Sequence, residues 1–205
     1  MSLSIGSAHG GRQVRPKKLR ASPVLSILKK GSDKMFGHPS LVLMLQRSAK
    51  QVAKSFSGSK LVVGDVSSED GGPLEGHHSH QSGRDADVLF YARDAKGKQV
   101  LPKKFVQYDA NGRATDGSGF VFDDERNWAL VESWTKDKRA GLKYIFVARW
   151  LRQRLLSYAL KHPKHKDYVP EAAALFLQPE GAEPHDDHFH VRIKCPDGQE
   201  RICIE

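Results

Sequence analysis

The sequence predicts a single-domain α+β protein with a central, mostly antiparallel sheet flanked by helices. Its 205 residues, 39% hydrophobic and 28% charged, are enough for one well-buried core and have the balance of a globular domain. Strand-like and helix-like segments interleave along the chain. The longest apolar stretches, 41–45 and 144–147, fall far short of the roughly 20 residues that cross a bilayer, so we expect no membrane span.

In the first half of the chain, the sequence predicts an extended segment followed by a helix, a strand and a loop. Residues 1–35 mix Gly, Ser, Pro and Lys without periodicity, which indicates an extended basic N-terminal segment ahead of one domain at 36–205. After Pro39, apolar residues recur at helical spacing to about residue 54 and predict an amphipathic helix. Residues 61–66 predict a buried strand, and residues 67–84, rich in Gly, Ser and His, predict a loop.

The second half alternates strands and helices. β-Branched and aromatic residues predict strands at 87–92, 120–122 and 143–147. Asp123 or Asp124 is expected to cap a helix that runs through Trp134, and a second helix is expected from Arg149 to Lys161, before Pro163 stops it. A short helix at 171–177 and a loop with Pro and Gly lead to a final strand at 188–194.

Positive charge is concentrated near the N-terminus. The formal net charge is +9, and residues 1–60 hold 12 Lys or Arg against one acid, Asp33. A cationic surface of this kind attracts nucleic acid, anionic lipid or an anionic polymer such as a bacterial cell wall. A solvated basic arm without a specific partner is an equally good interpretation, and composition alone leaves these alternatives open.

Histidines are clustered. Six of the ten lie in two short groups: His77, His78 and His80, then His185, His188 and His190. In the predicted final strand, His188 and His190 alternate with Phe189, so both imidazoles face one way and Phe189 faces the core. Such a pair can bind one metal jointly, or act as one ligand and one neighbouring acid or base. A His-rich surface without function is the alternative for either group alone.

The first histidine group supplies the rest of a metal site. His80 ends a loop that Gly83 allows to turn back, and Asp87 begins a strand. His80, Asp87 and one histidine of the second group give the three N or O ligands of a catalytic zinc site, whose fourth position holds water. Two cysteines are too few for a Cys-rich structural site, and imidazole with carboxylate suits zinc. We therefore expect one zinc ion per chain.

These residues carry a family resemblance. His80-x6-Asp87 followed by His188-x-His190 resembles the metallopeptidases that include lysostaphin-type endopeptidases, D-alanyl-D-alanine peptidases and the zinc-site relatives of hedgehog proteins. A wider set of motifs is similar to the penicillin-insensitive murein endopeptidase family: Ser4-Ile-Gly6, Gly37-His-Pro39, Val63-Gly-Asp65, Gly71-Gly-Pro73, the stretches from His77 to Asp87 and from His185 to Arg192, and Cys195-Pro196. The resemblance covers most of the chain and implies a hedgehog-like, D-Ala-D-Ala peptidase-like fold.

The resemblance also implies roles for the clustered residues. It assigns the zinc ligands as His80, Asp87 and His190, and His188 as the catalytic neighbour, with His185 lining the site. We further expect His185 to be a second catalytic group, which stabilises the developing oxyanion. His77, Asp85 and Arg84 are expected to line or support the site, and Asp85 favours the murein endopeptidase branch, because dipeptidase relatives have a small residue there.

The family's activity follows from the same resemblance. Its members hydrolyse the D-alanyl to meso-diaminopimelyl cross-link between peptidoglycan stem peptides, and penicillin does not inhibit them because no serine acyl-enzyme forms. Peptidoglycan is thus the expected partner, in the periplasm or otherwise outside the cytoplasm. The N-terminus shows no apolar signal-peptide stretch, so any export signal has been removed or never existed. The oligomeric state cannot be predicted.

Several roles stay open. Glu180 or Glu183 is an alternative general base, if the loop before the last strand folds over the metal. Arg84 or Arg192 could pair with substrate carboxylates, although such arginines more often form surface ion pairs. A catalytically inactive zinc-containing wall-binding protein would have nearly the same sequence. A metal-dependent nuclease is less favoured, and we expect no nucleic acid partner, because the basic residues lie far from the histidines in sequence.

Both cysteines lie near the C-terminal end. Pro196-Asp197-Gly198 is a turn signal between Cys195 and Cys203, so the flanking segments can return alongside each other. A local disulfide is expected in an oxidising compartment, and two thiols in the cytosol.

Overall fold

The structure, a computed structural model, describes residues 1–29 and 31–205. Six strands form its central sheet: β4 (Leu25–Ile27), β6 (Leu61–Val63), β7 (Asp85–Leu89), β11 (Leu142–Phe146), β12 (Phe176–Leu177) and β13 (His188–Ile193). They lie in the order β12-β11-β13-β7-β6-β4. The three inner pairings are antiparallel, whereas β12 with β11 and β6 with β4 are parallel. The predicted α+β class and mostly antiparallel sheet are confirmed.

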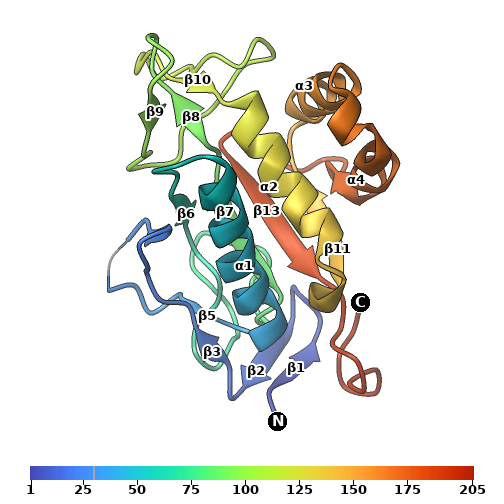
Figure 1. Cartoon of the computed structure of the whole chain (residues 1–205). Coiled ribbons are helices and arrows are strands. Elements are labelled where there is room, and N and C mark those ends of the chain that lie inside the picture. The colour runs from blue at the N-terminus through green and yellow to red at the C-terminus, as the bar shows by residue number, and fades with distance from the viewer. Residues whose placement is uncertain (30) are drawn as a thin grey trace.

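Helices cover one face of this sheet. Figure 1 shows α1 (Pro39–Ser55) and α2 (Asp124–Lys136) side by side in front of it, with α3 (Arg149–Leu160) and α4 (Val169–Leu175) beyond α2. Short 3-10 helices, η1 (Lys138–Ala140) and η2 (Pro163–Tyr168), follow α2 and α3. No helix in the described part of the chain is long and apolar enough to span a bilayer.

The helix starts follow from their capping residues. At α1, His38 accepts a hydrogen bond from the backbone N of Ser40 at 3.3 Å, and Pro39 occupies the first turn, where no backbone donor is needed. At α2, the carboxylate of Asp123 accepts from the backbone N of Arg126 at 3.1 Å, which settles the choice between two predicted caps.

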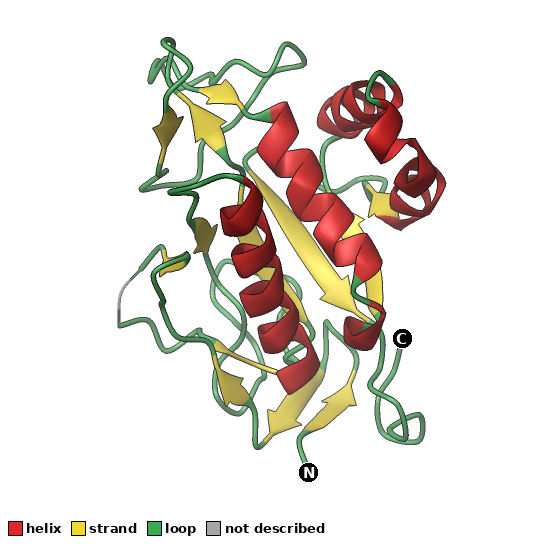
Figure 2. Ribbon diagram, in the orientation of Figure 1, coloured by secondary structure: helices red, strands yellow, loops and turns green. Residues whose placement is uncertain are grey.

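Smaller sheets surround the main one (Figure 2). They are built from β1 (Leu3–Gly6) with β2 (Gly11–Val14), β3 (Lys17–Lys18) with β5 (Phe36–Gly37), and β8 (Ala92–Arg93) with β9 (Gln99–Val100) and β10 (Val121–Phe122). The expectation of an irregular segment over 1–35 is therefore wrong in its secondary structure. The described part of this segment contains β1 to β4, and β4 is an edge strand of the central sheet that buries the Leu25 side chain in the core.

The C-terminal end is tied back to the start of the chain. Cys195 and Cys203 form a disulfide. Beyond it, the backbone N of Ile204 donates to the carbonyl of Gly6 at 3.0 Å, and the buried Arg84 donates to the carbonyl of Ile204 at 2.7 Å. These bonds join both termini to the loop that leads into β7.

Phe189 marks the core side of β13. Its ring is fully buried and packs edge-on against Phe90, at 4.6 Å between centroids, and against Trp134 of α2, at 5.6 Å. Because side chains alternate along a strand, His188 and His190 project from the opposite face. The helix-covered face therefore holds the core, and the other face is free for chemistry.

Replacing Phe189 with alanine should lower the free energy of unfolding by about 3–5 kcal/mol, since the change leaves a large cavity among rings that cannot collapse into it. Denaturant unfolding measures this loss. Leu43→Ala is the matched control, because Leu43 is 39% exposed on α1 and its loss should cost less than about 1 kcal/mol. Equal effects of the two changes would contradict this account of the core.

Candidate metal centre

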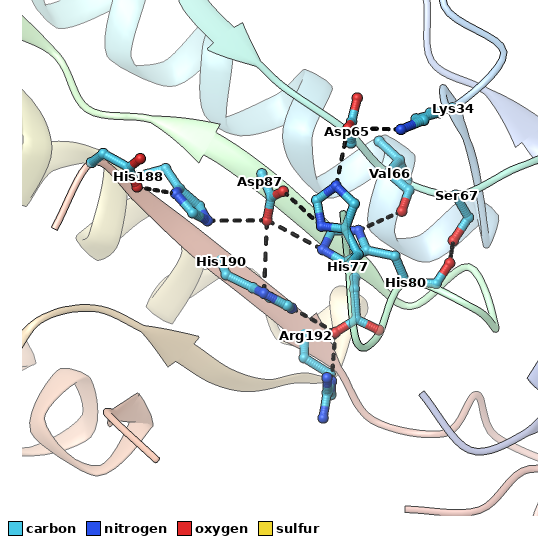
Figure 3. Close-up of polar contacts among 12 residues, drawn as sticks. Lys34, Asp65, Val66, Ser67, His77, His80, Asp87, His188, His190 and Arg192 are labelled. Atoms are coloured by element: carbon cyan, nitrogen blue, oxygen red, sulfur yellow. Dashed lines mark hydrogen bonds and ion pairs between the residues drawn. The ribbon is translucent and has the colours of Figure 1, made fainter. Parts of the chain in front are cut away.

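Two neighbouring strands present the chemistry of the site on one face. β7 and β13 pair in a register that sets His190 opposite Asp87 and Arg192 opposite Asp85. Ala86 between the two aspartates is fully buried in the core, as Phe189 is between the two histidines. The pleat therefore directs the carboxylates and the imidazoles to the same side (Figure 3). Asp87 lies in the middle of β7 rather than at its start, because the strand begins at Asp85.

The loop before β7 brings the first histidine group to these strands. His80 has a left-handed backbone, with φ of 68°, a conformation that non-glycine residues adopt at a cost. Its Nδ1 donates to the carbonyl of Val66 at 2.5 Å, and the hydroxyl of Ser67 donates to the backbone carbonyl of His80. Gly83 is needed for the return of the loop, because a Cβ there would lie 1.9 Å from Oε1 of Gln13. The loop thus fixes the ring of His80 with Nε2 pointing toward β7.

Imidazole nitrogens converge on one carboxylate oxygen. Oδ1 of Asp87 lies 3.2 Å from Nε2 of His80, 3.3 Å from Nε2 of His188 and 3.7 Å from Nδ1 of His190. His80 and Asp87 are almost completely buried, and within the described residues neither Nε2 of His80 nor Oδ1 of Asp87 has a hydrogen-bond partner. Buried polar atoms are costly when unpaired. A divalent cation held by imidazole and carboxylate is the partner that fits this donor set.

The described residues contain two sets of three possible ligand atoms, and within each set the atoms lie within 4.8 Å of one another. One set is His77, His80 and Asp87, and the other is His185, His188 and His190. We call these six residues the His/Asp cluster. The trio predicted from the sequence, His80, Asp87 and His190, is divided between the two sets, and Oδ1 of Asp87 is the atom that links them.

Asp85 holds His190 in place. Its Oδ1 accepts from Nε2 of His190 at 2.7 Å and from Nε of Arg192 at 2.6 Å. Because Nε2 carries the proton in that bond, Nδ1 of His190 is left as an acceptor that faces Asp87. Asp85 therefore supports the predicted ligand, and Arg192 is engaged with Asp85.

Asp85→Asn should weaken zinc binding about 10–100-fold, as removal of a carboxylate that orients a ligating histidine commonly does. The dissociation constant is measured by competition with a chromophoric chelator. An unchanged constant would contradict the supporting role of Asp85, provided that the variant unfolds at the temperature of the parent protein.

Burial and charge act against each other in the cluster. Burial raises the pKa of the Asp87 carboxyl, but the facing imidazoles of His80 and His188 hold it well below its usual range. Burial lowers the pKa of His188, yet Asp87 and Asp187 raise it to about 10. For His185, burial and the neighbouring His188 and His190 lower the pKa to about 4. In the absence of an ion, the buried Asp87 anion thus draws positive charge onto His188, whereas His185 stays neutral.

Aromatic rings lie against His188 and His185, the two predicted catalytic residues, and the carboxylate of Asp187 contacts His188. Nδ1 of His188 donates to Asp187 at 2.5 Å, and the ring of Phe105 lies edge-on to it at 5.1 Å between centroids. His185 stacks on Phe146 at 5.8 Å, and its Nδ1 is buried without a hydrogen-bond partner in the described chain. His188 is therefore oriented at one nitrogen and faces Asp87 with the other.

Three residues that contact histidines of the His/Asp cluster are absent from the sequence-based prediction of site residues: Asp65, Phe105 and Asp187. Asp65 accepts from Nε2 of His77 at 3.0 Å, and its place in the Val63-Gly-Asp65 motif was the available signal. Phe105 packs on Gly64, where a Cβ would lie 2.7 Å from its ring, a contact that no local pattern reveals. Asp187 precedes β13, so strand alternation does not describe it.

Other predicted residues lie elsewhere. The guanidinium of Arg84 donates to Ser82 at 3.2 Å and to Ile204 at 2.7 Å, so it ties β7 to the C-terminus. Glu180 and Glu183 are exposed on the loop before β13, and among the described residues neither forms a hydrogen bond or ion pair with the His/Asp cluster. The structure therefore gives no geometric support to either as general base.

The sequence comparisons agree with this architecture. A family model described as penicillin-insensitive murein endopeptidase matches residues 4–204. Two curated proteins of that name, from Escherichia coli O1:K1 / APEC and Escherichia coli strain SMS-3-5 / SECEC, are each 28% identical over 197 residues, covering 94% of this chain and 66% of the relative. A third, from Escherichia coli O157:H7 strain EC4115, is 27% identical over 198 residues. This chain thus spans just under two thirds of their length, and the matched stretch contains the whole His/Asp cluster.

Proposed function

The chain belongs to the penicillin-insensitive murein endopeptidase family, and we propose that it is a zinc-dependent endopeptidase that cleaves D-alanyl to meso-diaminopimelyl cross-links in peptidoglycan. One observation carries the metal dependence. Nε2 of His80 and Oδ1 of Asp87 are buried 3.2 Å apart without hydrogen-bond partners in the described chain, and Nδ1 of His190 faces the same oxygen. We propose these three residues as the zinc ligands, with one ion per chain.

The proposed chemistry divides between the ion and the protein. When bound, zinc would supply Lewis acidity, which polarises a scissile carbonyl and lowers the pKa of a water molecule. His188 takes and returns a proton at Nε2, because Asp187 holds its Nδ1 and leaves Nε2 facing the ligands. His185, kept neutral by burial and by its histidine neighbours, offers an unpaired Nδ1 to a substrate oxygen. Phe105 and Phe146 shield these rings from water.

His77 has a supporting place in this proposal. Its Nε2 donates to Asp65 at 3.0 Å, and its Nδ1 lies 3.6 Å from Oδ2 of Asp87. The ion pair of Lys34 with Asp65, at 3.6 Å, extends this support outward. With its proton on Nε2, His77 presents Nδ1 as an acceptor beside Asp87, so we propose that Asp65 orients His77 as a side chain that lines the site and does not donate to Asp87.

The location of the protein follows from the substrate. Peptidoglycan cross-links lie outside the cytoplasm, so we propose that the chain acts in the periplasm or elsewhere at the cell wall. The disulfide between Cys195 and Cys203 supports an oxidising compartment.

Purified cross-linked muropeptide dimers test the proposal directly. We expect the zinc-loaded protein to convert dimers to monomers, measured by liquid chromatography and mass spectrometry, and to do so equally in the presence of penicillin. Treatment with a chelator that removes the ion should slow conversion more than about 10⁴-fold, because the ion supplies several kcal/mol of transition-state stabilisation, and added zinc should restore it. Dimers left intact by the zinc-loaded protein would refute the proposed activity, and full turnover after verified metal removal would refute the metal dependence.

A further inference from the structure

A groove runs along the helical face of the molecule, on the side of the sheet away from the His/Asp cluster. It has a volume of about 750 Å³ and is lined by α1, α2 and the two 3-10 helices. Figure 1 shows α1 and α2 side by side on this face. Phe189 of β13 packs on Trp134 of α2, and strand alternation directs His188 and His190 to the opposite face of the sheet. No residue of the cluster lines it. The groove is therefore a feature independent of the proposed catalytic site.

The groove is strongly cationic. Seven Lys or Arg side chains and three Asp or Glu side chains line it, an excess of four positive charges. Two of the three acids are already paired: Asp137 lies 2.6 Å from Nε of Arg47, and Glu132 lies 2.5 Å from Nζ of Lys136. Lys138 is also paired, with Glu171 outside the lining. The rest of the excess faces solvent.

Three lysines carry this free charge. Lys50 and Lys54 are exposed one turn apart on α1, and Lys164 is exposed on η2. None of the three forms an ion pair with another residue that the structure describes. Lys50 and Lys54 belong to the basic excess of residues 1–60, and neither lies in the His/Asp cluster. The groove thus presents cations from two separate elements to one hollow.

The shape and composition of the groove favour an anionic peptide over other polyanions. A hollow admits a chain, whereas a bilayer surface is flat. Among the described residues of the lining, the aromatic side chains are Phe56, which packs against the core, and the buried His165, so neither offers an open face on which nucleic acid bases would stack. Glu125 also lines the groove and is exposed. Its carboxylate can pair with an amine of the ligand, while the lysines pair with the more numerous carboxylates of the same ligand.

We propose that this groove binds the carboxylate-bearing stem peptides of peptidoglycan, as a second contact on the face opposite the cluster. The inference rests on the proposed function, because the substrate is then a network that extends beyond one active site and can touch both faces. Each lysine contributes little alone, but several contacts on one polymer raise the local concentration of cross-links at the site. Screening by salt should weaken the contact.

Pelleting with purified peptidoglycan sacculi tests this groove without requiring turnover. The chelator-treated full chain is mixed with sacculi at low salt, and the bound fraction is measured after centrifugation. The triple variant Lys50→Glu, Lys54→Glu, Lys164→Glu should bind at least about tenfold more weakly, because repulsion replaces attraction at the same positions. After zinc is restored, its hydrolysis of small soluble dimers should equal that of the parent protein.

A matched variant controls for net charge. Lys17→Glu, Lys96→Glu, Lys98→Glu makes the same change in charge at exposed lysines outside the groove, and it should bind sacculi like the parent protein. A neutral variant, Lys50→Gln, Lys54→Gln, Lys164→Gln, should give an intermediate loss, and thermal unfolding verifies that each variant is folded.

The outcomes separate this inference from the proposed function. Unchanged binding of the groove variant, or equal losses in both charge-reversal variants, would overturn the inference. So would groove-dependent binding to anionic vesicles or duplex DNA without binding to sacculi. Groove-dependent binding to sacculi by a protein that leaves dimers uncut would refute the endopeptidase activity and support the groove.

Discussion

Asp87→Asn is expected to abolish zinc binding at micromolar metal and to lower turnover of muropeptide dimers by more than about 10⁴-fold. The reason is charge and geometry together. Oδ1 of Asp87 is the atom that three imidazoles approach, and it is the only anionic atom in the proposed ligand set. Asparagine keeps the size of the side chain but removes its charge, and loss of several kcal/mol of transition-state stabilisation gives an effect of this order.

The measurement pairs metal content with activity. Zinc is quantified after gel filtration by atomic absorption, and turnover is followed by chromatography of the dimers. Asp70→Asn is the matched control, since this exposed carboxylate belongs to no cluster and its loss should change neither quantity. An Asp87→Asn protein that retained both zinc and turnover would remove Asp87 from the ligand set.

Local periodicity predicted the main elements of the fold well. The helices at α1, α2 and α3 and the final strand were placed within a few residues, because apolar spacing, capping and Pro163 act over short distances. The strands within 1–35 were missed. Each is two to four residues long, too short for a clear alternation of apolar and polar residues. β1 and β2 pair with each other, whereas β3 and β4 depend on partners farther along the chain, β5 and β6.

The site was predictable where strand alternation governs it. Alternation placed His188 and His190 on one face, and the same rule relates Asp85 to Asp87. It could not find the contacts that loops make. Phe105 reaches His188 from a distant segment, and Arg84 turns toward the C-terminus although it neighbours Asp85 in sequence. The resemblance supplied the proposed ligand set, which remains a prediction.

His188→Ala is expected to lower turnover by about 10²–10⁴-fold while leaving zinc affinity within a few-fold of the parent value. His188 is not among the proposed ligands, and its hydrogen bond to Asp187 at 2.5 Å suits a ring held ready to transfer a proton at the other nitrogen. The alternative is concrete, because His188 also lies in a set of three histidines that could hold an ion. Loss of zinc in parallel with activity would make His188 a ligand, and near-normal turnover would deny it either role. His78→Ala, which removes an exposed histidine of the first group, should change neither quantity and controls for the loss of an imidazole.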